Sequence, residues 1–203
     1  IFEFNELEYL VTNDRRKDLQ NYWGYSTYSF FAPMSRYAAG GNHGQQAHEL
    51  KSLIKAIHQH DMEIILDVVF NHTAENGNDG PVYSSRGIDN SLFYILNENA
   101  DNMNYSGCGN TVNANQHNTK QFILDSLRYW VSEYHIDGFR FDLASALLRG
   151  PDGRIMSHSP LVEAIDHDPI LSNTKMIAEA WDAAGAYHVG SFPSNNWSEW
   201  NGK

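Results

Sequence analysis

The sequence has one cysteine, Cys108, among its 203 residues. A single thiol excludes an internal disulfide and any metal site built from several thiolates. Apolar runs are short as well, and none reaches the roughly 18 residues that a membrane span needs. Basic residues are scarce: 14 Lys and Arg stand against 25 Asp and Glu, a formal charge of −11. This acidic balance argues against nucleic acid and anionic membranes as the main partner, because both repel a net-negative protein.

The composition is that of a globular protein. Hydrophobic residues make up 41% of the chain and charged residues 19%, a balance that favours a folded core over disorder. The first residue, Ile1, already lies in an apolar run, and the last residues, 197–203, carry no terminating pattern. We therefore expect the sequence to be an internal piece of a longer protein, truncated at both ends.

Hydrophobic periodicity predicts alternating helices and strands. Residues 49–60 carry apolar side chains at helical spacing, and the β-branched run 63–70 is typical of a buried parallel strand. A second helix is predicted at about 119–134, followed by a strand at 136–143. A third helix near 160–168 precedes a strand at 175–180, and residues 1–4 are expected to end one further strand. Between the first strand and the second helix lies a stretch rich in Gly, Asn and Ser, residues 73–118.

This order predicts an α/β fold with a parallel sheet. No glycine-rich phosphate loop follows any strand, which disfavours a nucleotide-binding sheet. We predict a partial (β/α)8 TIM barrel that covers about strands 2 to 5. Residues 1–203 would then be part of one barrel domain, and residues 73–118 a long loop after strand 3 at the active-site face.

Charged residues collect at the ends of the predicted strands, where a barrel places its site. Arg140 and Asp142 are two apart on a strand and so share a face; the arginine is expected to lower the pKa of the carboxyl. Glu179 has apolar and aromatic neighbours, which are expected to raise its pKa. One ionised and one protonated carboxyl form the pair that glycoside hydrolysis needs, about 5–5.5 Å apart in a retaining enzyme. Taken singly, Asp142 is equally explained by a structural ion pair, and Glu179 is better explained by a solvated strand end.

Three motifs at the strand ends resemble conserved regions of the α-amylase superfamily. Asp-Val-Val-Phe-Asn-His at 67–72 resembles the first, Gly-Phe-Arg-Phe-Asp at 138–142 the second, and Ala-Glu-Ala-Trp-Asp at 178–182 the third. Within the superfamily, other segments resemble the isoamylase-type glycogen and starch debranching enzymes. These segments are 23–37, 86–90 and 104–111.

The resemblance implies a role for each matching residue. Asp142 would be the nucleophile, and Glu179 the general acid and then the general base. Arg140 would orient the nucleophile, His72 would bind sugar hydroxyls, and Tyr25 would stack on the sugar ring.

Three more residues are expected near the substrate. Trp181 is a sugar platform or a packing residue. Asp67 and Asn71 belong to the first motif, where Asp67 is more a structural partner than a catalyst. No metal site is predicted and no cofactor is required. Some superfamily members bind calcium, but the Asp/Asn-rich segment 76–80 does not have EF-hand spacing and is interpreted as a solvated loop.

One conserved region of the family has no counterpart. It contains a His-Asp pair, whereas His188 here is followed by valine. We therefore expect residues 1–203 alone to be inactive.

The resemblance implies a retaining hydrolase that cleaves α-1,6 branch points in glycogen, amylopectin or their dextrins, in the bacterial cytoplasm or a plastid. The alternatives are an α-1,4-acting amylase or branching relative, a non-catalytic glucan-binding subunit, and a metal-dependent hydrolase that uses Asp67, His72 and Glu179. The sequence leaves the oligomeric state open.

Overall fold

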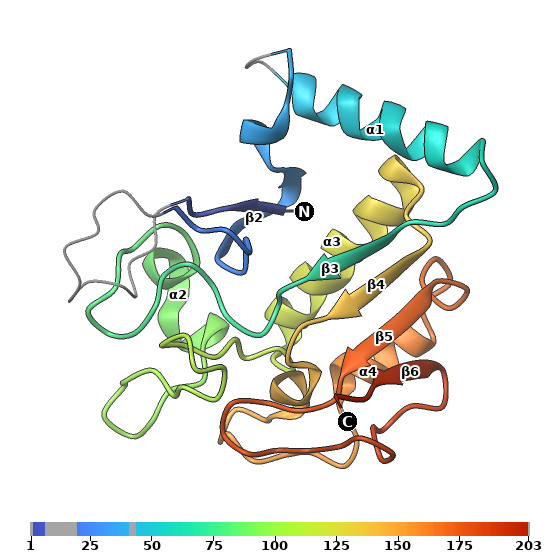
Figure 1. The fold of residues 1–203 in the computed structure, drawn as a ribbon. Helices are drawn as coiled ribbons and strands as arrows, with labels where there is room; N and C mark the ends of the chain where they lie inside the picture. Colours follow the sequence, from blue (N-terminus) through green and yellow to red (C-terminus); the bar gives the residue numbers. More distant parts are fainter. Residues whose placement is uncertain (1, 7–19, 41–43, 203) are drawn as a thin grey trace.

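The computed structural model describes residues 2–6, 20–40 and 44–202. Its centre is a parallel sheet with the strand order β3-β4-β5-β6 (Figure 1). The strands are β3 (Ile65–Val68), β4 (Gly138–Phe141), β5 (Lys175–Glu179) and β6 (Trp197–Trp200). The sequence predicted the first three of these strands but not β6.

Helices connect the first three strands of the parallel sheet, whereas a loop without a helix joins β5 to β6. Helix α1 (Gln45–His58) precedes β3, α3 (His117–Tyr134) joins β3 to β4, and α4 (Pro160–Asp166) joins β4 to β5. Two short 3-10 helices, η2 (Ser35–Tyr37) and η3 (Ala144–Leu148), follow β2 and β4. The three predicted α-helices are confirmed, with ends that differ by up to four residues.

The predicted loop at 73–118 contains a helix, α2 (Ser85–Phe93). Sequence periodicity missed it because the segment is rich in weak helix formers, and Asp89 has non-helical backbone angles. The side chain of Arg86 donates hydrogen bonds to the carbonyl oxygens of residues 76, 77 and 80. These bonds fold the loop back on itself.

A strand is present where residues 1–4 were expected to end one, but it does not belong to the parallel sheet. Strand β1 (Phe2–Phe4) pairs antiparallel with β2 (Thr27–Pro33) in a separate two-stranded sheet; Ile1 lies outside the described residues. A short apolar run does not reveal its partner, because strand pairing is set by distant parts of the chain. The assignment of the chain to barrel strands 2 to 5 therefore stays a prediction.

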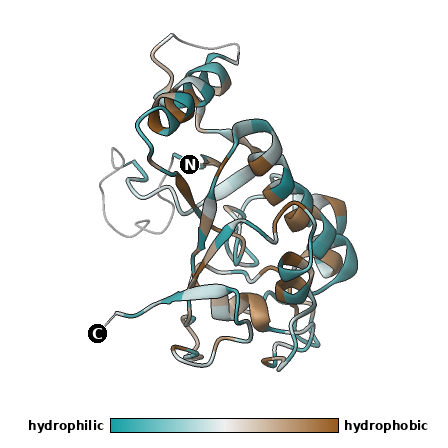
Figure 2. Cartoon of the chain, turned by 90° about the vertical axis from the view of Figure 1, so that its right-hand side faces the viewer, coloured by the Kyte–Doolittle hydropathy of each residue, from teal (hydrophilic) through white to brown (hydrophobic). Residues whose placement is uncertain are grey.

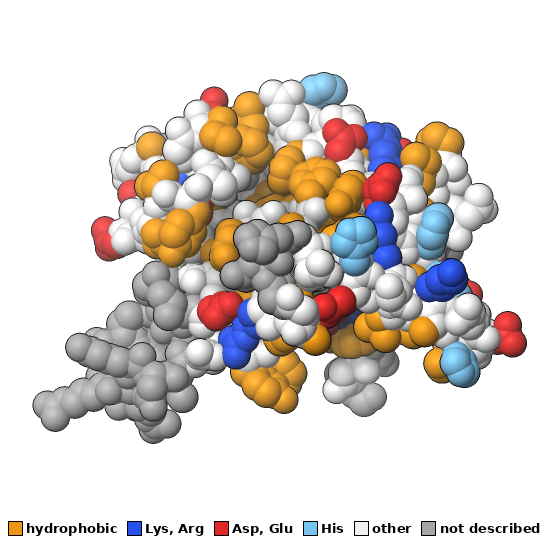
Figure 3. All heavy atoms as spheres, turned by 90° about the horizontal axis from the view of Figure 1, so that it is seen from above, with side chains coloured by type: hydrophobic (Ala, Val, Ile, Leu, Met, Phe, Trp, Pro, Cys, Tyr) orange, Lys and Arg blue, Asp and Glu red, His pale blue; other side chains and the backbone are white. Residues whose placement is uncertain are grey.

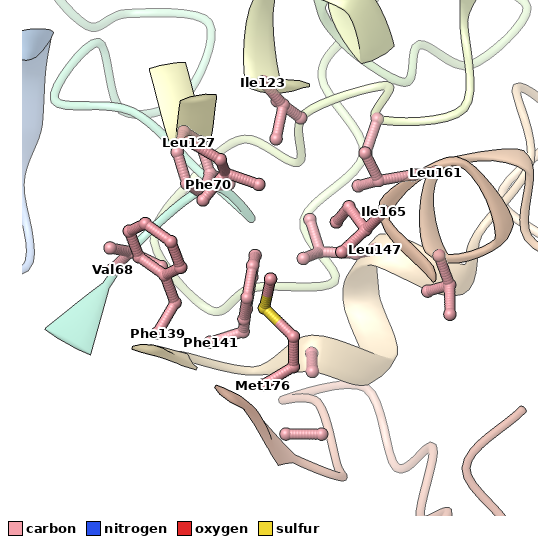
Figure 4. Packing of buried hydrophobic residues seen from close by; sticks show 14 of the residues in the cluster. Val68, Phe70, Ile123, Leu127, Phe139, Phe141, Leu147, Leu161, Ile165 and Met176 are labelled. Atoms are coloured by element: carbon pink, nitrogen blue, oxygen red, sulfur yellow. The ribbon is translucent and has the colours of Figure 1, made fainter. Parts of the chain in front are cut away.

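The hydrophobic core lies between the parallel sheet and the helices α3 and α4. Figure 2 shows helices to one side of the sheet, and Figure 4 shows the side chains that meet in between. They include Val68, Phe70, Phe139, Phe141 and Met176 from the sheet side, and Ile123, Leu127, Leu161 and Ile165 from the helices. Burial of each such side chain stabilises the fold by about 1.5–3 kcal/mol.

Trp130 of α3 packs against the two-stranded sheet. Its ring is fully buried and stacks on Phe2 with centroids 5.2 Å apart. Its indole N–H donates to the carbonyl oxygen of Phe30 at 2.9 Å. The small sheet is thereby fixed against α3.

Helix α1 is largely exposed. Ile54 is its one buried residue, whereas Leu53 is 55% exposed. Figure 3, which views the molecule from above, shows hydrophobic side chains at the surface on this side. None of the helices within the described ranges is both long and apolar enough to cross a membrane.

Candidate active site

The carboxyl ends of the parallel strands bring charged residues to one edge of the sheet. In the strand register, Asp67 of β3 lies opposite Arg140 of β4, and Glu179 of β5 lies opposite Trp200 of β6. Asp142 follows β4 directly. Side chains two residues apart on a strand share a face, so these groups converge above the same end of the sheet.

Arg140 is the centre of this cluster. Its Nη1 is 2.8 Å from Oδ1 of Asp67 and 3.2 Å from Oδ1 of Asp142, and its Nη2 is 3.0 Å from Oε2 of Glu179. Burial alone would lower the pKa of the guanidinium, but its hydrogen bond to Asp67 and the charges of the three carboxylates raise it. One buried cation therefore bridges three acidic side chains from three strands. The structure brings together the three residues that the sequence predicted as catalytic.

Glu179 has the environment of a proton donor. Burial is the main cause that raises the pKa of its carboxyl, and the charge of Asp142 adds to it. The backbone N–H of Leu143, 2.8 Å from Oε2, and the guanidinium of Arg140 oppose the shift without cancelling it. The direction agrees with the prediction from the apolar neighbours of Glu179.

Leu143 reaches Glu179 through an unusual backbone conformation. Its φ is +43°, in the left-handed region that is sterically unfavourable for a branched side chain. This turn comes directly after Asp142 and points the Leu143 N–H at the carboxylate of Glu179. Backbone strain of this kind is common at functional sites.

Asn71 holds Asp142 through two hydrogen bonds. Its side chain is fully buried, and its amide nitrogen donates to both the carbonyl oxygen and Oδ2 of Asp142, each at 2.8 Å. Both amide hydrogens are thus used within the protein. Asn71 is thus bound to Asp142, and the substrate contact that the sequence predicted for it stays a prediction.

His72 is also committed to the protein. The ring is 3% exposed, with Nε2 2.6 Å from the carbonyl oxygen of Tyr25 and Nδ1 2.6 Å from Oδ1 of Asn71. Burial lowers the pKa of the imidazole, against the opposing effects of the Tyr25 carbonyl and Asp142. The predicted bond from His72 to sugar hydroxyls stays a prediction, because both ring nitrogens already have protein partners here.

Tyr25 and Asp67 form one wall of the site. The phenol of Tyr25 donates to Oδ2 of Asp67 at 2.8 Å. Burial, followed by this hydrogen bond, raises the pKa of Tyr25 to about 12, so the hydroxyl remains a donor at neutral pH. Asp67 binds both Tyr25 and Arg140, which is consistent with the structural role expected for it.

Trp181 follows β5, two residues beyond Glu179. Its backbone N–H donates to the carbonyl oxygen of Glu179 at 2.8 Å, and a β-bridge pairs it with Tyr187. Together with Gly202 these two aromatic residues line an open pocket, whose lining does not include Glu179 or Asp142. Tyr187 is 54% exposed, so an aromatic surface is available at this pocket.

Two features of the site were missed by the sequence. Trp200 places its ring over Arg140, with the guanidinium carbon 4.6 Å from the ring centroid. Arg149 forms a buried ion pair with Asp182 at 2.6 Å and lies over the ring of Tyr105 at 3.9 Å. Asp182 is the last residue of the third motif, but its partner comes from another loop and has no local signal.

The Asp/Asn-rich segment 76–80, considered above for calcium, is hydrogen-bonded to another part of the same loop. The side chain of Asn78 donates to Asp101 at 2.7 Å and accepts from the backbone N–H of Asn102 at 2.8 Å. Within residues 2–6, 20–40 and 44–202, no group of three or more His, Cys, Asp or Glu side chains is arranged to hold a metal ion.

Comparison with curated proteins gives close relatives. The chain is 54% identical to "Isoamylase 3, chloroplastic" of rice (Oryza sativa subsp. japonica), with 100% of the chain and 27% of the relative aligned. It is 49% identical to "Isoamylase 1, chloroplastic" of Arabidopsis thaliana, with 99% of the chain and 29% of the relative aligned. It is 47% identical to the "Glycogen debranching enzyme" of Enterobacter sp., with 92% and 28% aligned. The chain thus spans less than a third of the length of these relatives.

Comparison with solved structures gives pullulanases, which are TIM-barrel enzymes of the α-amylase family. The pullulanase of Anoxybacillus sp. LM18-11 complexed with maltotetraose has a TM-score of 0.71 and 28% identity, over 88% of this chain and 26% of that one. The pullulanase of Paenibacillus barengoltzii complexed with the same sugar has a TM-score of 0.74 over 99% of this chain and 30% of that one; at 24% identity it bears on the fold alone. No family model matches the sequence.

Proposed function

This chain is homologous along its length to a part of the isoamylases and glycogen debranching enzymes of the α-amylase family, and from this we propose that it carries the catalytic carboxylates of an α-1,6-glucan debranching hydrolase. The observation that carries the proposal is the single guanidinium of Arg140 bound to both Asp142 and Glu179. An arrangement with two carboxyl groups close together suits a retaining glycosidase.

The reaction follows from the two environments. Asp142 attacks the anomeric carbon of the branch sugar and forms a covalent glycosyl–enzyme, while Glu179 gives its proton to the departing 6-oxygen. Glu179, now a carboxylate, takes a proton from water, and the resulting hydroxide oxygen displaces Asp142 from the anomeric carbon. Two displacements restore the α configuration. The raised pKa of Glu179 supports its role as the acid.

The surrounding residues position these two. Arg140 keeps a positive charge between the carboxylates, and Asn71 fixes both the backbone and the carboxylate of Asp142. His72 fixes the backbone of Tyr25, whose half-buried ring would stack on the sugar. Trp181 would form an aromatic platform.

The substrate we propose is a branched α-glucan such as glycogen, amylopectin or a branched dextrin. The names of the relatives support this class, and the names of the plant relatives place those proteins in the chloroplast. For this protein we propose a plastid or the bacterial cytoplasm.

The test is a digest of amylopectin by the full-length protein that contains this segment. Linear chains of many lengths, with deeper iodine colour, are expected from α-1,6 cleavage. Short malto-oligosaccharides with fading colour would instead indicate an α-1,4-acting enzyme. Glucan binding without any release would indicate a non-catalytic subunit.

A further inference from the structure

Trp200 ends strand β6 at the mouth of the site. It lies opposite Glu179 in the register of the parallel sheet, so the two side chains lie on the same face. The indole ring is 48% exposed, whereas the Arg140 side chain beneath it is 7% exposed. One face of the ring covers the guanidinium, with the guanidinium carbon 4.6 Å from the ring centroid.

The contact with Trp200 adds a restraint on the orientation of the Arg140 guanidinium. The two Nη atoms bind Asp67, Asp142 and Glu179, but Nε is buried and has no hydrogen-bond partner. An aromatic face within about 6 Å attracts a guanidinium through the ring quadrupole, and more strongly where water is excluded. Such a contact restrains the plane of the guanidinium, which hydrogen bonds through its Nη edge alone leave free to tilt.

We propose that Trp200 is a positioning residue that fixes the plane of the Arg140 guanidinium, so that one cation serves both Asp142 and Glu179. This role rests on the proposed function, because it is measured through catalysis. The contact between Trp200 and Arg140 does not depend on that function. The plane matters because Nη1 must face Asp142 while Nη2 faces Glu179. If the plane tilts, the two carboxylates lose their common counter-charge.

The competing role for an exposed aromatic ring at this place is a sugar platform. A platform binds substrate, and its loss raises KM with little effect on the ionisation of the site. A positioning residue acts on kcat and on the pH profile. The charged groups that face the guanidinium are Asp67 from β3, Asp142 from the end of β4 and Glu179 from β5. Since Arg140 lowers the pKa of Glu179, a weaker hold on Arg140 raises it.

The experiment compares Trp200→Leu and Trp200→Phe in the full-length protein, with branched dextrin as substrate. Leucine keeps an apolar cover over Arg140 but has no π face, whereas phenylalanine keeps one. For Trp200→Leu we expect kcat to fall several-fold and the alkaline limb of kcat/KM to move up by about half a pH unit. Trp200→Phe should restore both. The control is Tyr37→Leu. Tyr37 is also an exposed aromatic residue, but it lies after the end of β2, whereas Tyr25 lies before its start. Its variant should match the wild type.

A rise in KM with unchanged kcat and pH profile in Trp200→Leu would overturn the proposal in favour of a platform. A wild-type protein without debranching activity would instead refute the proposed function. In that case a double-mutant cycle of Trp200→Leu and Arg140→Met, read by urea unfolding, decides the inference. Coupling between the two changes supports the contact, and strict additivity overturns it.

Discussion

The amide of Asn71 donates to two oxygens of Asp142, one on the backbone and one on the carboxylate, each at 2.8 Å. The amide therefore fixes the position of Asp142, the proposed nucleophile, through Oδ2, while the other carboxylate oxygen, Oδ1, is bound by Arg140. Because Asn71 itself is fully buried, its orientation is set by the protein and not by the substrate.

Asn71→Ala is expected to lower kcat by about 100-fold with little change in KM, because a misplaced nucleophile loses its alignment with the anomeric carbon. Steady-state kinetics on a branched dextrin measures both constants. The exposed Asn99→Ala serves as the control. If KM rose while kcat held, Asn71 would be a sugar ligand, as its sequence motif had suggested.

Glu179→Gln is expected to lower kcat by about 10²–10⁴-fold on branched glucans, because the leaving oxygen then departs without a proton. A malto-oligosaccharyl fluoride, whose fluoride leaves unprotonated, should lose far less in the first step. Comparing the two substrates in burst kinetics measures the difference. An equal loss on both would mean that Glu179 is not the acid.

The pH profile should report the same group. As the proposed acid, Glu179 would have to be protonated. Its pKa is raised mainly by burial, so activity should persist above the ordinary carboxyl range and fall as pH rises through the raised value. The alkaline limb of kcat/KM measures this pKa. A limb at the ordinary glutamate value of about 4.3 would contradict the assignment.

Arg149 and Asp182 connect the loops that follow β4 and β5. The pair is buried, and the Asp182 carboxylate also accepts the N–H groups of Ala184 and Ala186. Arg149→Met should destabilise the fold by about 3–5 kcal/mol, because it leaves a buried charge without its partner. Urea unfolding measures the loss, and the double variant Arg149→Met/Asp182→Leu should recover part of it. A loss below about 1 kcal/mol would mean that water replaces the pair.

Glu75 organises the loop after β3. Its carboxylate accepts the N–H groups of Tyr83, Ser84 and Arg86 and the hydroxyl of Tyr94. Burial alone would raise the pKa of Glu75, but these hydrogen bonds lower it overall. Its stabilisation is therefore complete above the ordinary glutamate pKa and is lost as pH falls through the lowered value.

Glu75→Gln should cost about 1–3 kcal/mol at neutral pH and less below about pH 4. Urea unfolding at the two pH values measures the difference, with the exposed Glu98→Gln as the control. An equal cost at both pH values would show that the charge of Glu75 is not what the loop requires.

Much of this fold was predictable because its signals are local. The β-branched run before Asn71 and the helical spacing of Ile123, Leu127 and Trp130 depend on neighbours in the chain alone. Strand β6 was not predictable in this way: Trp-Ser-Glu-Trp is short, mixed in polarity and followed by Asn201. Its identity as a strand comes from pairing with β5.

The site shows the same division. Asp142, Glu179 and Arg140 were found because the ends of parallel strands meet at one edge and because their motifs are specific. The sequence did not predict the bonds from Asn71 to Asp142, the protein partners of His72 or the ring of Trp200 over Arg140. The Asn71–Asp142, His72–Tyr25 and Trp200–Arg140 contacts join residues that lie far apart in the sequence, and only the packed fold sets those distances.

The most direct test of the central claim is a proton NMR time course of a branched dextrin with the full-length enzyme. The account predicts that the anomeric signal of α-1,6 linkages disappears while that of α-1,4 linkages stays, and that α reducing ends appear before mutarotation produces β. Asp142→Asn should leave the spectrum unchanged. Initial β reducing ends, or loss of the α-1,4 signal first, would contradict a retaining debranching enzyme built on Asp142 and Glu179.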